Sequence, residues 1–187
     1  MDTMRRRLVY GLGLMLCAPA SFAEPRRARS LAVPEGYRLV AHERRVPSAV
    51  LYGVALQESA LVFGEAGNRC SLPWPWTLNV AGRPARFAMR AQAEERLDAS
   101  LRSGIDSVDV GPMGINWRYH KTRLVSVQRS LDPYWNLRVG ASLLGEHFAA
   151  CNDWREAVGR YHAPANKQRA EAYSASVFAR LRRLGHA

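Results

Sequence analysis

Lysine is nearly absent from this 187-residue chain, and acidic residues are few. Only two of its 27 basic side chains are Lys, and the 25 Arg face 16 Asp and Glu, which gives a formal net charge of +11. This excess favours anionic partners such as nucleic acid, anionic lipid or acidic polymers. Arg in place of Lys can follow from coding bias, so charge alone does not lead us to expect nucleic acid. With 48% hydrophobic and 23% charged residues, the composition excludes disorder and fits one globular domain.

Motifs for several common chemistries are also missing. The sequence has no Gly-x-x-x-x-Gly-Lys phosphate loop, no His-Glu-x-x-His helix, no Cys-x-x-Cys pair and no Gly-x-Ser-x-Gly turn. Its five His residues are scattered, and isolated His residues are more often ordinary polar side chains than metal ligands. We therefore expect neither a metal nor a cofactor.

The first 23 residues have the pattern of an export signal. Three Arg at positions 5–7 precede a largely apolar run over 8–20, and Ser21-Phe22-Ala23 supplies the small residues that a signal peptidase needs. We predict cleavage after Ala23, a periplasmic location and no transmembrane segment in the mature chain. We further expect a solvated leader over 24–33 and one domain over 34–187.

Two alternatives to a cleaved signal fit these residues less well. A membrane anchor needs about 20 apolar residues, and this run is shorter and stops at Pro19. Lipid attachment at Cys17 is disfavoured because the bulky Leu16 precedes the cysteine, where such sites usually carry a small residue.

Cysteine is scarce as well, since removal of the signal leaves only Cys70 and Cys151. A pair of cysteines in an exported protein is a plausible disulfide, because the compartment is oxidising. Two unpaired thiols are the alternative.

The most informative segment is an apolar helix that we predict over residues 48–61. Val50, Leu51, Val54 and Ala55 leave it almost no polar face, so it should be buried, and Glu58 is its only charge. Burying a carboxylate costs several kcal/mol unless the group is paired or protonated, and a protonated carboxyl is what acid catalysis requires. The alternative is a Glu that reaches solvent or an Arg at the helix end.

Other helices are expected around this one, with irregular segments between them. Pro, Gly and two Trp over residues 64–84 suggest a kinked wall in which Trp74 and Trp76 stack on sugar rings or fill the core. Further predicted helices cover 37–45 and 83–102, begin at the N-caps Asp132 and Asp153, and end the chain on the face Ala172, Ser176, Ala179 and Leu184. The whole is one mostly helical domain.

Three segments carry a resemblance to a known family. Ala55-Leu56-Gln57-Glu58-Ser59, residues 108–116 (VDVGPMGIN) and residues 159–163 (GRYHA) resemble, in order and spacing, the motifs of lysozyme-like lytic transglycosylases. Residues 73–80 and 131–137 are similar to the branch encoded with conjugative-transfer and type IV secretion systems. The resemblance covers about residues 34–185.

The resemblance implies an α-rich lysozyme-like domain that cleaves peptidoglycan between N-acetylmuramic acid and N-acetylglucosamine, opening the wall for a conjugation or secretion apparatus. It assigns Glu58 as the sole catalytic acid and base. The residues that it implies for substrate binding are Ser59, Trp76, Asn79, Gly111, Met113, Asn116, Tyr161 and His162.

The chain departs from the family pattern at two motifs. Pro112 and Gly114 replace the usual Leu and Gln, which removes a substrate contact of that Gln, and His162 replaces the usual Asn. A non-catalytic wall-binding component of the same apparatus is therefore the alternative function. Because a lytic transglycosylase needs only one carboxylate, we expect Asp109 to be a turn or capping residue rather than a second catalytic acid.

Overall fold

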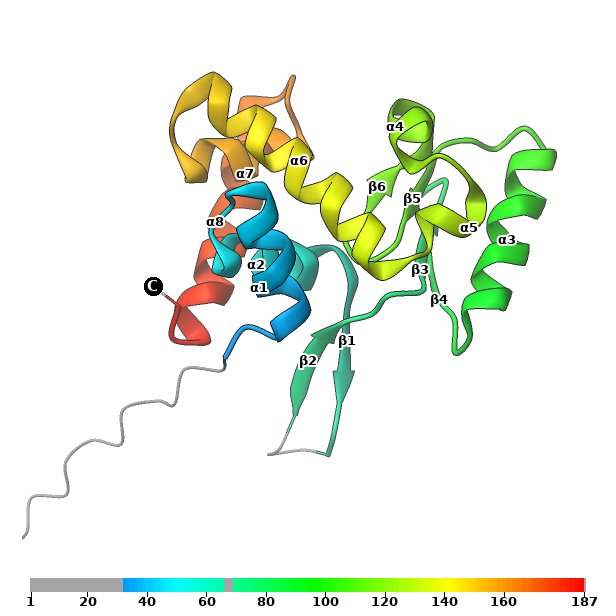
Figure 1. Cartoon of the computed structure of the whole chain (residues 1–187), viewed down its shortest axis with the longest axis horizontal. Helices are drawn as coiled ribbons and strands as arrows, with labels where there is room; N and C mark the ends of the chain where they lie inside the picture. The colour runs from blue at the N-terminus through cyan, green and yellow to red at the C-terminus, as the bar shows by residue number, and fades with distance from the viewer. Residues whose placement is uncertain (1–31, 66–68, 187) are drawn as a thin grey trace, which may run out of the picture.

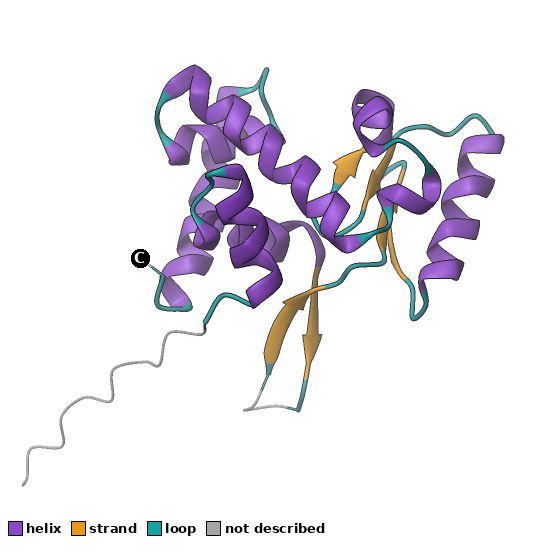
Figure 2. Cartoon of the chain, in the orientation of Figure 1, coloured by secondary structure: helices purple, strands orange, loops and turns teal. Residues whose placement is uncertain are grey.

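The computed structural model describes residues 32–65 and 69–186, so the predicted signal peptide and most of the leader lie outside the described residues. The described part contains eight helices and six short strands (Figures 1 and 2). None of these helices is long and apolar enough to span a membrane. The expectation of a mainly helical chain is confirmed, and its small β part forms two separate sheets.

Helices make up one side of the molecule around the buried α2. Residues Val50–Leu56 of α2 are all buried, as its apolar sequence predicts, and α2 contacts each of the other helices of this group. The long α6 extends from this group toward the second part of the fold (Figure 1). The group comprises α1 (Glu35–Arg44), α2 (Ser48–Ser59), α6 (Pro133–Cys151), α7 (Trp154–His162) and α8 (Lys167–Arg183).

A four-stranded antiparallel sheet forms the second part, in the order β4-β3-β5-β6. Its strands are β3 (Thr77–Val80), β4 (Arg83–Arg86), β5 (Val108–Val110) and β6 (Ile115–Asn116), accompanied by α3 (Arg90–Arg102), α4 (Trp117–Leu124) and α5 (Val127–Ser130). Leu78, Val80, Val108 and Val110 pack on one face of the sheet against Leu97 of α3. Because side chains alternate along a strand, the residues between them lie on the opposite face.

A two-stranded hairpin connects these two parts. Strands β1 (Ala60–Phe63) and β2 (Cys70–Pro73) pair in antiparallel register and project away from the helices (Figure 1). The helix predicted over 48–61 therefore ends two residues early, because Ala60 and Leu61 pair with β2.

The helix predicted over 83–102 is wrong at its beginning. Residues Arg83–Arg86 form β4, which pairs with β3 across the two-residue turn Ala81-Gly82, and the helix begins only at Arg90. Both turn residues have positive φ, 49° and 82°, the geometry of the tight turns that fit a twisted hairpin. Ala-Gly lacks the Asn or Asp that usually marks such a turn.

Two of the predicted helix starts are confirmed. The Asp132 side chain accepts a hydrogen bond from Trp135 N at the start of α6, and the Asp153 side chain accepts one from Glu156 N at the start of α7. Each bond satisfies a backbone donor that the first turn leaves free. These caps fix where α6 and α7 begin, and so where their buried faces point.

Candidate active site around Glu58

Glu58 lies in the last turn of α2 and is largely enclosed. About 20% of its side chain is exposed, and no Lys or Arg forms an ion pair with it in the described part of the chain. Burial raises the pKa of Glu58 to about 7, while a hydrogen bond from Tyr173 lowers it and the charge of Asp109 raises it. The expectation of a raised pKa is met, and a carboxyl of this kind can donate and accept a proton near neutral pH.

Tyr173 of α8 is the direct partner of this carboxyl, and it lies outside every motif that the sequence singles out. Its hydroxyl donates a hydrogen bond of 2.5 Å to Glu58 Oε1. The face predicted for the last helix was wrong, because Tyr173, Ser174, Val177 and Leu181 are the buried residues of α8. The four-residue spacing of Tyr173, Val177 and Leu181 is the signal that could have found it.

His162 lies beside the same pair, at the end of α7. Its ring stacks in parallel on the ring of Tyr173, with 4.3 Å between centroids, and its Nδ1 lies 3.9 Å from Glu58 Oε1. Burial lowers the pKa of His162 and the Asp109 charge raises it, with a net downward shift. His162 is half-exposed, so its ring lies next to the carboxyl and within reach of a ligand.

Ser59 and Met113 lie beside the site but face inward. Ser59 is fully buried, and its hydroxyl lies 2.9 Å from Ala55 O and 3.0 Å from Pro112 O. The Met113 side chain is also fully buried and packs in the main core, close to Gly140. Neither side chain reaches the surface, so any contact with a substrate would involve the backbone of these residues. Ser59 instead fastens the end of α2 to the turn at Gly111–Gly114.

That turn approaches Glu58 so closely that only glycine fits at its end. Gly114 has φ +59°, and a Cβ built there would lie 2.7 Å from Glu58 Oε2. A side chain at this position would displace the carboxyl and would hold a strained backbone conformation. The glycine at position 114 is thus tied to the placement of Glu58.

Asn136 of α6 holds the turn from behind. It is fully buried, accepts a hydrogen bond from Met113 N at 2.9 Å, and donates to Val110 O and Ser130 O. Gly111 makes room for it, because a Cβ at Gly111 would lie 2.5 Å from Asn136 Nδ2. Gly111 is itself buried and serves this packing.

Tyr161 of α7 also holds the turn. Its hydroxyl donates a hydrogen bond of 2.7 Å to Met113 O, and not to Glu58. Burial and the charge of Glu58 both raise the pKa of Tyr161, so it stays a neutral donor. Tyr161 therefore lies near the carboxyl of Glu58 and is connected to it through the turn.

Three polar side chains form a row on the face of the sheet opposite the one that packs against α3. Asp109 of β5 pairs in register with Asn79 of β3 on one side and with Asn116 of β6 on the other. Its two carboxylate oxygens accept hydrogen bonds from Asn79 Nδ2 at 3.0 Å and Asn116 Nδ2 at 2.8 Å. The expectation that Asp109 is a turn or capping residue is wrong, because it occupies the middle of a strand.

Trp76 lies on the side of the sheet that faces α3, away from this polar row. It packs against the core between the sheet and α3, and its indole Nε1 is enclosed without a partner among the described residues. Trp74 crosses it edge to face and donates its own indole N–H to Phe87 O. Trp76 thus fills part of this core and stays partly exposed.

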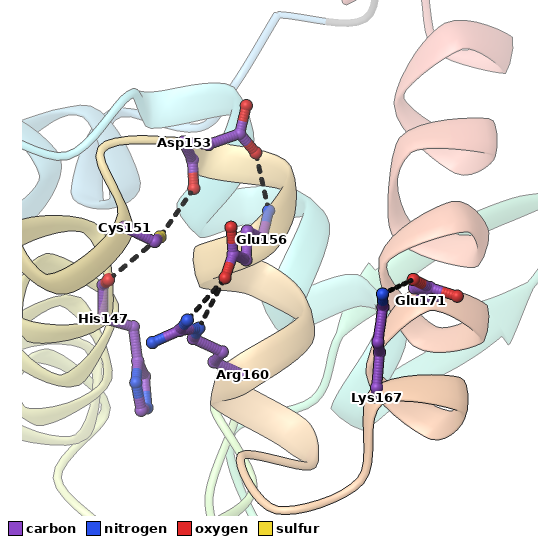
Figure 3. A network of polar contacts seen from close by, with 7 residues as sticks. All are labelled: His147, Cys151, Asp153, Glu156, Arg160, Lys167 and Glu171. Carbon is purple, nitrogen blue, oxygen red and sulfur yellow. Dashed lines mark hydrogen bonds and ion pairs between the residues drawn. The ribbon is translucent and has the colours of Figure 1, made fainter.

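The predicted disulfide between Cys70 and Cys151 is absent, and both are free thiols. Cys70 is exposed on the projecting hairpin, whereas Cys151 ends α6 among the helices (Figure 1). The Cys151 thiol lies 3.1 Å from His147 O and 3.3 Å from Asp153 O (Figure 3). Pairing fails because the hairpin carries Cys70 away from the helical part.

A separate groove of about 810 Å³ runs between α7 and α8. Its charges neutralise one another: Arg160 pairs with Glu156, and Lys167 lies 3.9 Å from Glu171 (Figure 3). No three His, Cys, Asp or Glu side chains gather anywhere in residues 32–65 and 69–186 as a metal would require. The isolated, titratable carboxyl of Glu58 therefore remains the chemically distinctive group.

Comparison with known proteins adds no family. No protein-family model, curated protein or solved structure matches the chain.

Proposed function

We propose that this protein is a peptidoglycan lytic transglycosylase with a lysozyme-like domain and that Glu58 is its general acid and base. The proposal rests on the three-motif resemblance of the sequence. The structural observation that supports it best is Glu58 itself, an enclosed carboxyl with a pKa of about 7 and no cationic partner among the described residues. A group of this kind is protonated often enough to act as an acid and is regenerated as a base.

The proposed reaction uses the same carboxyl twice. Glu58 gives its proton to the glycosidic oxygen between N-acetylmuramic acid and N-acetylglucosamine, and the C1–O bond breaks with its electron pair leaving on that oxygen. The 6-hydroxyl of the same muramoyl unit then attacks C1 and returns its proton to Glu58. The product ends in a 1,6-anhydro ring, no water is consumed, and no cofactor takes part.

The arrangement around Glu58 supports this use. Tyr173 orients one oxygen of the carboxyl, and Gly114 leaves room for the other. A catalytic group held in one geometry avoids a cost of reorganisation in the transition state. Export to the periplasm and action beside a conjugation or secretion apparatus belong to the same proposal, because they follow from the signal pattern and from the branch that the sequence resembles.

The test is digestion of purified peptidoglycan by the mature protein, followed by mass analysis of the products. We expect ends one water lighter than hydrolysed ends, and near-complete loss of cleavage in Glu58→Gln. Glu95→Gln is a matched control, because Glu95 is an exposed side chain of α3 and should leave activity unchanged. Reducing ends as the main product would reassign the protein to hydrolysis. A folded wild type that binds peptidoglycan without cleaving it would favour the wall-binding alternative.

A further inference from the structure

The hydrogen bond between Tyr173 and Glu58 depends on where the tyrosine ring stands. The two residues come from different elements, α8 and the end of α2, and the donating hydroxyl is the atom of Tyr173 farthest from its backbone. A small rotation about the side-chain bonds therefore carries the hydroxyl out of the range of about 2.5–3.0 Å that such a bond allows. The bond persists only if neighbouring groups confine the ring.

The ring of His162 covers one face of the Tyr173 ring. The two planes are 2° apart and the ring centroids are 4.3 Å apart. This is the most nearly parallel aromatic pair of the described residues, since the other stacked pair, Phe148 and Trp154, is tilted by 13°. A flat contact of this kind fills the space into which the tyrosine ring could otherwise tilt.

The position of His162 is itself fixed by the end of α7. The preceding residue, Tyr161, donates its hydroxyl to Met113 O at 2.7 Å, which fastens this end of the helix to the turn at Gly111–Gly114. His162 is the last residue of α7 and follows this anchor directly. Its ring therefore stands on a held backbone and can serve as a wall for Tyr173.

His162 makes no hydrogen bond to the carboxyl. Its Nδ1 lies 3.9 Å from Glu58 Oε1, which is beyond hydrogen-bond distance. Burial lowers the pKa of His162, so the ring is mostly neutral at pH 7 and gives no strong ion pair with Glu58. The contact of His162 with the ring of Tyr173 is therefore the route by which it acts on Glu58.

We propose that His162 is a positioning residue: its ring holds the ring of Tyr173, and Tyr173 in turn holds Glu58 Oε1. This inference rests on the proposed glycan cleavage, and it gives His162 a role other than the substrate contact that the resemblance implies. Burial and the charge of Glu58 raise the pKa of Tyr173 well above its usual range, so its hydroxyl stays a donor and Oε1 an acceptor. The proton that Glu58 gives to the glycosidic oxygen is then carried by Oε2, the oxygen beside Gly114.

The first test compares three variants in steady-state cleavage of a soluble peptidoglycan fragment. His162→Ala removes the ring, and we expect kcat to fall about 10-fold or more because the acid loses its fixed geometry, with KM changed by less than about 2-fold. His162→Phe keeps a flat ring at this position and should regain most of the rate. His42→Ala is the control, because His42 is an exposed residue of α1 and should behave as the wild type.

Two patterns in these rates would overturn the inference. The first is a wild-type kcat in His162→Ala, or an equal loss of kcat in the Ala and Phe variants, because a flat ring would then not be what matters. The second is a raised KM with an unchanged kcat in both variants, because that pattern marks a lost substrate contact.

A second test needs no substrate. Tyr173→Phe removes the hydrogen bond that lowers the Glu58 pKa, so it should raise this pKa in an NMR titration of labelled Glu. The same substitution should raise the Glu58 pKa less in a His162→Ala background, because the bond is then already loosened. Equal shifts in the two backgrounds would overturn the inference. A wild type that cleaves no glycan would instead overturn the proposed function, while the titration would still decide whether His162 acts through Tyr173.

Discussion

The Tyr173 hydroxyl donates a hydrogen bond of 2.5 Å to Glu58 Oε1, and so joins the last helix to the end of α2 across 115 residues of sequence. The bond favours the charged carboxylate, whereas burial favours the protonated one. The pKa of about 7 is the balance of these opposing influences, with the charge of Asp109 added. Each contribution can be removed separately.

Removal of the tyrosine hydroxyl should move the titration of Glu58 upward. In Tyr173→Phe the hydrogen bond that lowers the Glu58 pKa is lost while burial remains, so the pKa should rise above about 7. The alkaline limb of the pH–rate profile, which reports loss of the acid form, should shift to higher pH. Tyr119→Phe is the control, because Tyr119 is 75% exposed and lies on α4. An unmoved limb in Tyr173→Phe would contradict the assigned role of this bond.

The free energy of unfolding of the protein should depend on pH through the titration of Glu58. Its folded pKa, about 7, lies above the ordinary 4.5, so the folded state binds the proton more tightly. The resulting stabilisation is fully present below about pH 4.5 and is lost as pH rises through about 7. It amounts to at most about 3 kcal/mol. The free energy of unfolding of Glu58→Gln, taken relative to that of the wild type, should therefore increase as the pH rises from 5 to 8.

Urea unfolding at several pH values measures this difference. His120, His147 and His162 have lowered pKa values, which give a pH dependence of the opposite sign, but they are present in both proteins and largely cancel. A constant difference between wild type and Glu58→Gln from pH 5 to pH 8 would show that Glu58 titrates normally.

Gly114 should be far less tolerant of substitution than another glycine with positive φ. Gly114→Ala and Gly82→Ala both impose a left-handed conformation on Ala, at about 1–2 kcal/mol. Only at Gly114 does the new Cβ meet Glu58, whereas nothing lies within 4 Å at Gly82. We expect Gly114→Ala, and Gly114→Gln more severely, to lose activity beyond the loss of stability that thermal unfolding records for Gly82→Ala. Equal activities in the two Ala variants would show that the Glu58 carboxyl can move away from the new Cβ without loss of function, and would contradict this prediction.

The two cysteines should react as free thiols in native protein purified without reductant. A maleimide should label Cys70 quickly, because it is exposed, and Cys151 more slowly, because its thiol is partly enclosed beside His147 O and Asp153 O. Intact-mass analysis over time follows the two additions, and Cys70→Ser assigns them. A protein that takes no label until it is reduced would restore the disulfide predicted from the sequence.

Local patterns in the sequence determined several features by themselves. Glu58 is the only charge in an apolar helix, and the sequence alone predicts that such a helix is buried in the core. That the carboxyl is enclosed, rather than reaching solvent at the helix end, was decided by the fold. Asp132 and Asp153 cap their own helices three residues ahead, which depends only on neighbouring backbone. These signals need no knowledge of the rest of the chain.

Tertiary structure alone decided which groups meet Glu58. Tyr173 reaches it because α8 packs on α2, and Asp109 stands between two Asn residues because of strand register. Cys70 is kept apart from Cys151 because it begins β2 of a hairpin that projects away from the helices. Contacts between distant segments depend on the packing of whole elements, and a shift of one residue in register or of one helix face replaces every partner. The sequence therefore places Glu58 on a buried helix, and the fold determines which groups shift its pKa.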